Sequence, residues 1–213
     1  MSEEAFDVKV LREIAGLMKD LFSKLEGEST IEWVVAFKRF LQKENPWDPV
    51  SKDWFWRKID ENTIEVNLDF PIGISILEAK LQVWKKCSGL VTVMRKGKDL
   101  FVDGRKMILH LEPEQISGGL AGAALLTRLV EKDVLHPNVI KALLDNVHLI
   151  PNSFKKNSAR KTQYIFFWAT GFEDVDGTLY VCCLNFSGGR WCGSFFLVDD
   201  YFDDRSPAVL LAS

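Results

Sequence analysis

The segment from Tyr164 to Phe202 constrains the fold most, because it holds 12 of the 25 aromatic residues of the chain. Asp-Gly and Ser-Gly-Gly sequences, which favour tight hairpin turns, divide it into three runs typical of β-strands, at about 163–170, 178–186 and 190–198. Along each run both faces are apolar, whereas a strand with one solvated face would alternate with polar residues. The sequence therefore predicts a three-stranded antiparallel meander, covered on both faces by helices or another sheet, with Phe167 and Phe195 buried.

Two cysteines of this meander face each other in one of two possible registers. If Ser187-Gly188 forms the turn, Cys183 lies opposite Cys192, with the Cβ atoms about 4.5–5.5 Å apart. If Gly188-Gly189 forms the turn, the two cysteines do not pair. A facing pair could act as a redox pair or as half of a metal site. We favour the alternative, small apolar thiols inside a sheet.

The middle of the chain predicts a small antiparallel sheet with one helix. Residues 63–70 alternate apolar and polar side chains, which is typical of a half-buried strand. A capping-box spacing from Ser75 to Glu78, followed by Leu81 and Trp84 at helical spacing, predicts a helix over 75–87. Turns at Gly97 and at Asp103-Gly104 then join three short strands, at about 90–95, 99–102 and 106–111.

Helices are predicted elsewhere. Residues 3–26 and a second segment that ends near Asn45-Pro46 carry apolar stripes at helical spacing, which predicts a hairpin of helices. The region 112–161 is predicted to be mainly helical, and His136-Pro137-Asn138 is typical of a helix start. The predicted fold class is α+β, in three segments: an N-terminal helical hairpin (1–45), a small α+β unit (46–115), and a helical linker with the C-terminal aromatic meander (116–213). The last two segments could form one domain.

Composition excludes several classes of protein. With 47% apolar and 27% charged residues, the 213-residue chain is not a disordered or collagen-like protein. A net charge of −3 gives no general attraction to nucleic acid or anionic lipid. The apolar runs are far shorter than the roughly 18 residues of a membrane helix, and the acidic start predicts no secretory signal. The four scattered cysteines then favour reduced thiols in the cytoplasm.

No complete catalytic or metal-binding pattern is present in the sequence. The three histidines are isolated and no Cys-x-x-Cys occurs, so common zinc spacings are absent. His136 is interpreted as a helix cap, and Asp174-Val175-Asp176-Gly177 as a hairpin turn because the glutamate of a calcium loop is lacking. The glycines at 118–122, the basic residues at 85–106 and the aspartates at 199–204 are interpreted as a linker, solvated turns and an acidic loop. We therefore predict no catalytic, metal-binding or cofactor-binding residue and no cofactor.

One segment is a candidate contact surface. Between residues 46 and 60, aromatic side chains lie among charges, and they could stack on bases or sugars while an arginine adds a cation. The alternative is a small apolar cluster under a long loop. The candidate surface consists of Trp47, Trp54, Trp56 and Arg57.

Several strings carry a resemblance, among them Leu68-Asp69-Phe70-Pro71-Ile72-Gly73, Phe101-Val102-Asp103-Gly104-Arg105, Leu135-His136-Pro137-Asn138-Val139 and Pro207-Ala208-Val209-Leu210-Leu211-Ala212. From about residue 60 onward the chain resembles an uncharacterised bacterial protein family of unknown function. The resemblance implies a bacterial, cytoplasmic protein and carries over no catalytic residue.

The function expected from the sequence is a non-catalytic, intracellular protein-interaction protein. Its partner would be another protein of unknown identity, and neither a membrane nor a nucleic acid is favoured as a partner. The alternative is an enzyme of unrecognised type or a nucleic-acid-binding protein.

Overall fold

The computed structural model describes Lys19 and residues 54–71 and 80–212. The chain divides into two units, Met1–Ser51 and Lys52–Ser213, and the helices and strands described below belong to the second. The predicted helical hairpin and Trp47 of the predicted contact surface lie outside the described residues.

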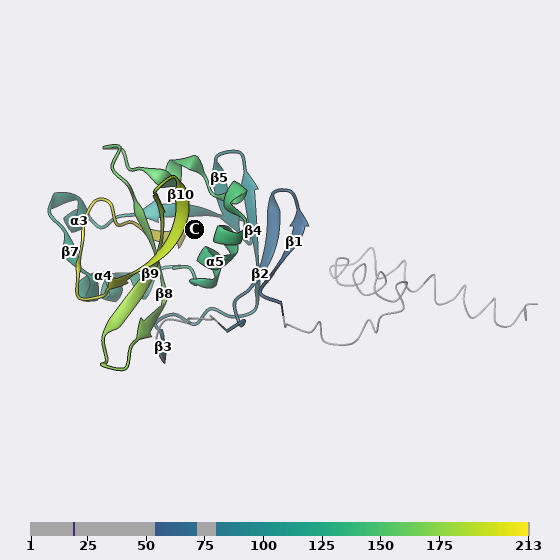
Figure 1. The fold of residues 1–213 in the computed structure, drawn as a ribbon. Helices are drawn as coiled ribbons and strands as arrows, with labels where there is room; N and C mark the ends of the chain where they lie inside the picture. Colours follow the sequence, from purple (N-terminus) through teal and green to yellow (C-terminus); the bar gives the residue numbers. More distant parts are fainter. Residues whose placement is uncertain (1–18, 20–53, 72–79, 213) are drawn as a thin grey trace, which may run out of the picture. The chain divides into compact units, whose positions relative to one another are not determined.

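One curled sheet of ten strands organises the second unit (Figure 1). An N-terminal meander contributes β1 (Trp56–Asp60), β2 (Thr63–Asn67), β4 (Leu90–Lys96), β5 (Asp99–Val102) and β6 (Arg105–His110). A C-terminal meander contributes β8 (Tyr164–Glu173), β9 (Leu179–Ser187) and β10 (Arg190–Leu197). Strand β12 (Ala208–Leu211) lies between the two, antiparallel to β6 and parallel to β8, while β3 (Lys80–Val83) pairs with the far part of β8.

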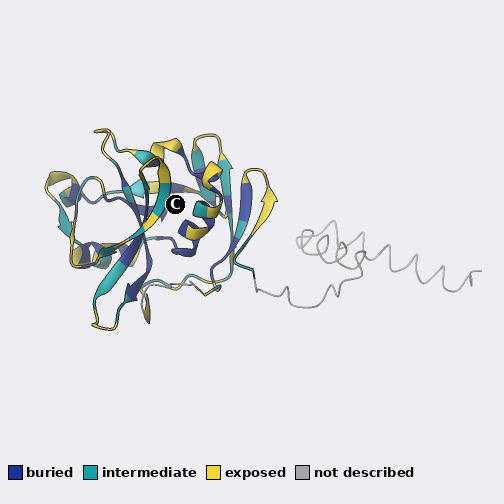
Figure 2. Cartoon of the chain, in the orientation of Figure 1, coloured by how far each residue is buried: buried dark blue, intermediate teal, exposed yellow. Residues whose placement is uncertain are grey.

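Helix α5 (Asn138–Asp145) lies within the curve of the sheet and contacts both β2 and β10 (Figure 1). Its core-facing residues are almost fully buried, and Figure 2 shows much of the helix coloured as buried. The other helical segments are α3 (Pro113–Ser117), α4 (Gly122–Leu129) and the 3₁₀ turns Val147–Leu149 and Asn152–Lys155. A two-stranded sheet joins β7 (Leu120–Ala121) to β11 (Tyr201–Phe202).

Strand β8 separates two apolar clusters. Ile165 and Phe167 belong to the cluster around α5, whereas Phe166 and Trp168 belong to the cluster around α4. All four side chains are at most 1% exposed. Burial of each stabilises the fold by roughly 1.5–3 kcal/mol relative to exposure. The expectation that β8 is covered on both faces is therefore confirmed.

A bulge in β8 binds the segment that follows β3, which begins at Trp84, through backbone hydrogen bonds. The pairing of β8 with β9 is interrupted between Phe167 and Gly171. Within the bulge, the carbonyl oxygen of Ala169 accepts hydrogen bonds from the amides of Trp84 (3.0 Å) and Lys85 (2.9 Å). A Cβ atom on Gly171 would lie 2.3 Å from the Trp84 ring, so only glycine permits this contact. The bulge thus fixes the chain at the start of residues 85–88, which line the pocket described below.

The α+β prediction with two separate sheets is wrong. The described residues form a mostly β unit in which both meanders belong to one sheet, because β12 hydrogen-bonds to both. The individual strands of the meanders occur within a few residues of their predicted bounds. A strand of four residues that is buried on both faces lacks the alternation by which a half-buried strand is recognised, and β12 therefore went unpredicted.

The helix predicted over 75–87 is also wrong where the structure describes it, because residues 80–83 form β3. The spacing of its apolar residues predicted a helix with one buried face, which the structure does not have. Leu81 and Val83 are 49% and 62% exposed, whereas Trp84 packs against the α4 cluster, so these residues do not share one buried face.

The turn between β9 and β10 decides the cysteine register. Gly188 and Gly189 form the turn with φ angles of 58° and 80°, which places Cys183 opposite Ser194 rather than Cys192. All four cysteines are free thiols. On β10, which ends the sheet, Phe195 is 41% exposed, so its expected burial is wrong, while that of Phe167 is confirmed.

This difference in burial predicts a difference in stability. Phe167→Ala should lower the free energy of unfolding by about 3–5 kcal/mol, because it leaves a cavity in a closed cluster. Phe195→Ala should cost clearly less, since its ring already meets solvent. Urea unfolding of the two variants beside the parent measures both values, and equal losses would contradict the two-sided burial of β8.

Candidate functional site

A pocket of about 320 Å³ lies where the N-terminal meander, β12 and the start of α5 meet. We name it the Arg105–His136 pocket. Its polar lining comes from residues 85–88, from the turn between β5 and β6, and from the segment before α5. Its apolar wall consists of Leu68, Val91, Val102, Val139 and Leu211.

Arg105 and Asp133 form the charged side of the pocket. Asp103 and Gly104, with φ angles of 48° and 76°, make the predicted hairpin turn and place Arg105 at the start of β6. The Asp133 carboxylate accepts hydrogen bonds from Lys85 Nζ at Oδ1 (2.9 Å) and from Arg105 Nη2 at Oδ2 (2.6 Å). These two cations hold the pKa of Asp133 below its usual range. Both of its oxygens are therefore occupied within the protein.

His136 is the buried polar group of the pocket. Its side chain is 9% exposed, and Nδ1 accepts a hydrogen bond from the amide of Asn138 at 3.2 Å. This bond satisfies one of the amides that lack a partner at the start of α5. The predicted cap is nevertheless wrong by one residue, because Pro137 occupies the cap position and no side chain caps the helix there. Burial lowers the pKa of His136 to about 4, against an opposing effect of the Asp69 carboxylate. At neutral pH the ring is therefore uncharged, with its proton on Nε2.

The Nε2–H group of His136 is not used in the hydrogen bond that holds the ring. Among the described residues it has no hydrogen-bond partner, yet it is not one of the fully enclosed side-chain atoms that lack a partner. Because His136 lines the pocket and is otherwise buried, this donor reaches the pocket interior. A buried donor without a protein partner costs free energy unless water or a ligand accepts from it.

Asn138 holds the pocket wall in place. Its Nδ2 donates to the carbonyl oxygens of Asn67 (3.0 Å), Leu68 (3.2 Å) and Phe70 (3.0 Å). These hydrogen bonds tie the end of β2 to the first turn of α5. Asn138 therefore helps to fix the position of Leu68 relative to His136 in the pocket.

The pocket lacks the arrangement that activates a cysteine. Burial raises the pKa of the Cys87 thiol, so the sulfur is protonated at neutral pH. His136 cannot accept that proton, because Nδ1 is occupied by the Asn138 amide and Nε2 already carries hydrogen. The geometry therefore fits binding through hydrogen bonds and apolar contacts rather than nucleophilic catalysis by Cys87.

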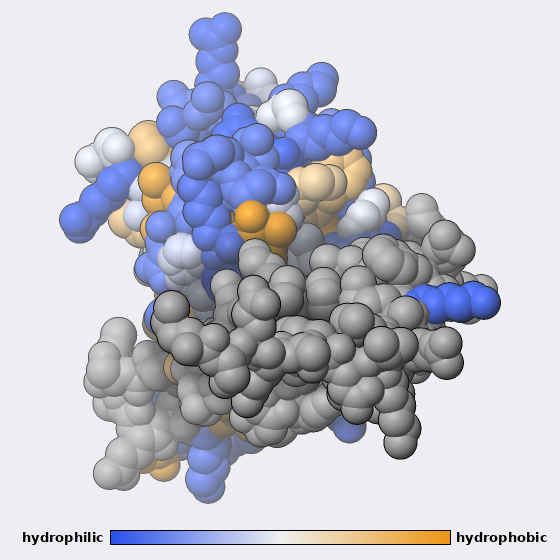
Figure 3. All heavy atoms as spheres, turned by 90° about the vertical axis from the view of Figure 1, so that its right-hand side faces the viewer, coloured by the Kyte–Doolittle hydropathy of each residue, from blue (hydrophilic) through white to orange (hydrophobic). Residues whose placement is uncertain are grey.

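The described part of the predicted contact surface is occupied by contacts within the protein. Trp56 Nε1 donates to Asp145 Oδ2 at the end of α5 (2.9 Å). The guanidinium of Arg57 pairs with Glu65 at 2.7 Å and lies 5.0 Å from the centre of the Trp54 ring. The described residues visible in Figure 3 are mainly hydrophilic, with small separate apolar patches.

Other sites considered from the sequence have structural roles. Asp174 Oδ1 accepts the amides of Asp176 (3.0 Å) and Thr178 (2.9 Å) within its own turn, and Oδ2 accepts Tyr180 Oη (3.1 Å). Burial raises the pKa of Cys182, and it raises that of Cys183 to about 12. Among the described residues, no group of three or more histidine, cysteine or acidic side chains could hold a metal ion.

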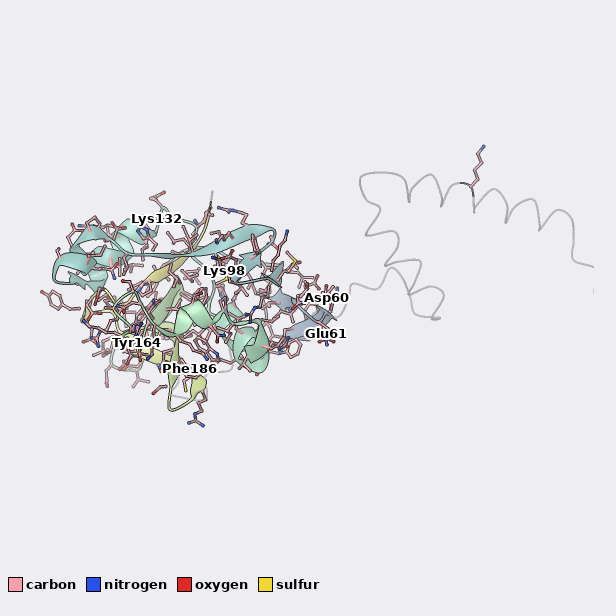
Figure 4. The ribbon with its side chains drawn as sticks, turned by 90° about the horizontal axis from the view of Figure 1, so that it is seen from above. Asp60, Glu61, Lys98, Lys132, Tyr164 and Phe186 are labelled. Carbon is pink, nitrogen blue, oxygen red and sulfur yellow. The ribbon has the colours of Figure 1, made fainter. Side chains whose placement is uncertain are left out.

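A charged cluster near α3 was missed by the sequence analysis. Glu112 Oε1 lies 2.8 Å from His110 Nε2 and 2.6 Å from Lys132 Nζ, and Arg128 pairs with Glu114 at 2.6 Å. Hydrogen bonds from Arg128 lower the pKa of Glu114 to about 2. Figure 4 shows Lys132 far from Asp60 and Glu61, at the other end of the described unit. Every charge of the cluster has a partner, so it ties α3 to α4 and offers no free group.

The basic residues between 85 and 106 were interpreted as solvated turns, and the structure corrects this for Lys85 and Arg105, which form ion pairs with Asp133, while Lys86 is exposed. Lys85, Lys86 and Arg105 line one pocket although 19 or more positions separate Arg105 from the lysines in the sequence. Only the pairing of β4, β5 and β6 brings them together. The apolar neighbours of His136, Leu135 and Val139, were the signal that its ring would be buried.

Comparison of the chain with protein-family models, with curated proteins and with solved structures finds no match. Within the described residues, no helix is both long enough and apolar enough to cross a membrane.

The depressed pKa of His136 predicts a pH dependence of stability. Between pH 6.5 and 4 the unfolded chain binds a proton at residue 136 that the folded chain does not, so stability falls as the pH falls. From pH 7 to pH 5 this contribution should cost the parent about 2 kcal/mol of unfolding free energy.

Replacement of the titrating ring isolates the effect. In His136→Gln, the part of the loss in unfolding free energy that comes from residue 136 should disappear. His148→Gln, which changes an exposed histidine, should show the same loss between pH 7 and pH 5 as the parent. Urea unfolding at the two pH values provides the comparison. A parent and a His136→Gln variant with equal losses would show that the ring is not held neutral.

Proposed function

We propose that this protein is a non-catalytic binding protein that holds a small molecule in the Arg105–His136 pocket. The observation that carries the proposal is a pocket of about 320 Å³ lined by His136, whose Nε2–H donor has no partner among the described residues. Small-molecule sites commonly have volumes of about 300–1,000 Å³, mostly apolar walls and a few placed polar groups. The Arg105–His136 pocket has this composition.

The proposal keeps the expectation of a protein without catalytic activity. The Cys87 thiol is protonated, and His136, the histidine that lines the same pocket, cannot act as its base because Nδ1 accepts the Asn138 amide. We also place the protein in the cytoplasm in this proposal, since its four cysteines are free thiols and reducing compartments maintain that form.

Binding of another protein through the tryptophan-rich segment is a second candidate that stays a prediction. Contacts of Trp56 with Asp145 and of Arg57 with Glu65 favour a structural role for this segment. Solvent-exposed aromatic side chains without such partners would have favoured the contact surface.

The three histidines of the chain provide a direct test. Two six-carbon probes, hexan-1-ol and hexanoate, are titrated into the full-length protein while the histidine ring signals are recorded by ¹H–¹³C NMR. The expected result is a saturable shift of the His136 ring signals with at least one probe. The ring signals of His110 and His148, which do not line the pocket, should stay unchanged and serve as internal controls.

The result that overturns the proposal is equally direct. If neither probe shifts the His136 signals at millimolar concentration, or if all three histidines shift together without saturation, the pocket is not a binding site. Assignment of the three signals follows from the His136→Gln and His148→Gln variants.

A further inference from the structure

The charges that line the Arg105–His136 pocket do not balance. In the lining itself, three cations, Lys85, Lys86 and Arg105, face two carboxylates, Asp103 and Asp133, which leaves one positive charge in excess within the lining. The Asp69 carboxylate, which accepts the amide of Gly89 at 3.1 Å, acts on His136 from outside this lining. Asp133 pairs with both Lys85 and Arg105, so these three side chains neutralise part of one another. Asp103 Oδ1 accepts the amide of Thr92 at 2.7 Å and is thereby held to its own hairpin.

Lys86 supplies the excess charge. In the part of the chain that the structure describes, its ammonium group forms no ion pair and no hydrogen bond, and its side chain is exposed at the pocket. A cation near the surface of a pocket attracts an anion with an effective dielectric constant well below that of water. The pocket therefore favours a negative group on its ligand.

The remaining polar groups of the pocket also favour a ligand with hydrogen-bond acceptors. His136 presents the Nε2–H donor, and it is buried to more than nine-tenths. The Cys87 thiol adds a weak donor beside it in the lining. By contrast, the acceptor atoms of Asp133 are occupied by Lys85 and Arg105.

The apolar wall limits the rest of the ligand. Leu68, Val91, Val102, Val139 and Leu211 lie on the side of the pocket that continues into the α5 cluster. Burial of apolar ligand surface against such a wall contributes about 25 cal/mol per Å². A bare inorganic ion would leave this wall without a partner.

We infer that the ligand of the Arg105–His136 pocket is a compact organic anion, with one carboxylate or phosphate group on a short apolar body. The negative group lies toward Lys86 and the Nε2–H of His136, and the apolar body lies against Leu68, Val102 and Leu211. This inference rests on the proposed function, and it adds the chemical class of the ligand.

Three probes of equal chain length test the charge requirement: hexanoate, hexan-1-ol and hexylamine. Isothermal titration calorimetry of the full-length protein at pH 7 and low salt should give an affinity for hexanoate at least tenfold above that for hexan-1-ol. Hexylamine should bind more weakly than either. Hexyl phosphate then decides which anionic group is preferred, and inorganic phosphate alone should bind at least tenfold more weakly than hexyl phosphate.

Matched lysine variants locate the charge. Lys86→Gln should reduce the preference for hexanoate over hexan-1-ol at least threefold. Lys98→Gln changes an equally exposed lysine in the turn between β4 and β5 (Figure 4), outside the pocket lining, and should leave the preference unchanged. Because both side chains are exposed, both variants are expected to fold, which thermal unfolding verifies.

A histidine variant tests the donor. His136→Phe keeps a ring of similar size but removes Nε2–H, and it should weaken hexanoate binding about tenfold, as expected for a hydrogen bond to a charged group. Its folding is verified by circular dichroism, and Lys86→Gln carries the test if His136→Phe does not fold.

The outcomes separate the inference from the proposed function. If hexan-1-ol shifts the His136 signals and binds as tightly as hexanoate, the pocket is a binding site but the anion inference is wrong. If inorganic phosphate binds as tightly as hexyl phosphate, the inference that the ligand has an apolar body is wrong. If no probe binds at His136, the proposed function itself fails.

Discussion

Insertion of β12 between the two meanders is the interaction on which the rest of the structure depends. Its four residues pair with β6 on one side, and Ala208 pairs with Phe166 of β8 on the other. The carbonyl oxygens of Arg205 and Pro207, just before the strand, extend the contact by accepting hydrogen bonds from the amides of Tyr164 (2.8 Å) and Phe166 (2.9 Å). Val209 packs in the cluster around α5, whereas Ala208 and Leu210 pack in the cluster around α4. The strand therefore closes both clusters at once, and a change that displaces it would expose the two inner strands together.

The same strand end also holds the pocket. The amide of Leu211 donates to the carbonyl oxygen of Asp133 at 2.9 Å, and Arg105 Nε donates to the carbonyl oxygen of Ala212 at 2.9 Å. The two partners of the central ion pair are thus each bound to the backbone at the end of β12. In this way the position of the charges in the pocket follows from the closure of the sheet rather than from local sequence.

The sequence predicts some elements of the fold and of the pocket but not others. Alternation and turn chemistry predicted most strands, and the positive φ angles of Asp103 and Gly104 confirm the Asp-Gly turn that they define. The sequence could not reveal that β12 joins the meanders, because pairing over about 100 residues leaves no periodicity in a four-residue strand. It also could not bring Lys86, Arg105 and His136 to one pocket, because their proximity depends on that pairing. The interpretation of His136 as a cap placed the ring correctly near the start of α5, but the cap position is held by Pro137, and the interpretation left Nε2 without a role.

The two nitrogens of His136 connect the stability of the fold to the proposed binding. Nδ1 accepts an amide at the start of α5, and burial keeps the ring neutral, so the folded state carries an uncharged donor in the lining of the pocket. A bound anion stabilises the protonated form of a neighbouring imidazole and therefore raises its pKa. In the proposed complex the negative group would thus oppose the desolvation that lowers the pKa of His136. By linkage, affinity for an anion that keeps its charge, such as a phosphate monoester, rises as the pH falls toward 4, in the same range where the empty protein loses stability. A carboxylate ligand becomes protonated in this range and loses that advantage. Burial in the fold therefore lowers the pKa of His136, whereas the bound anion of the proposed complex would raise it.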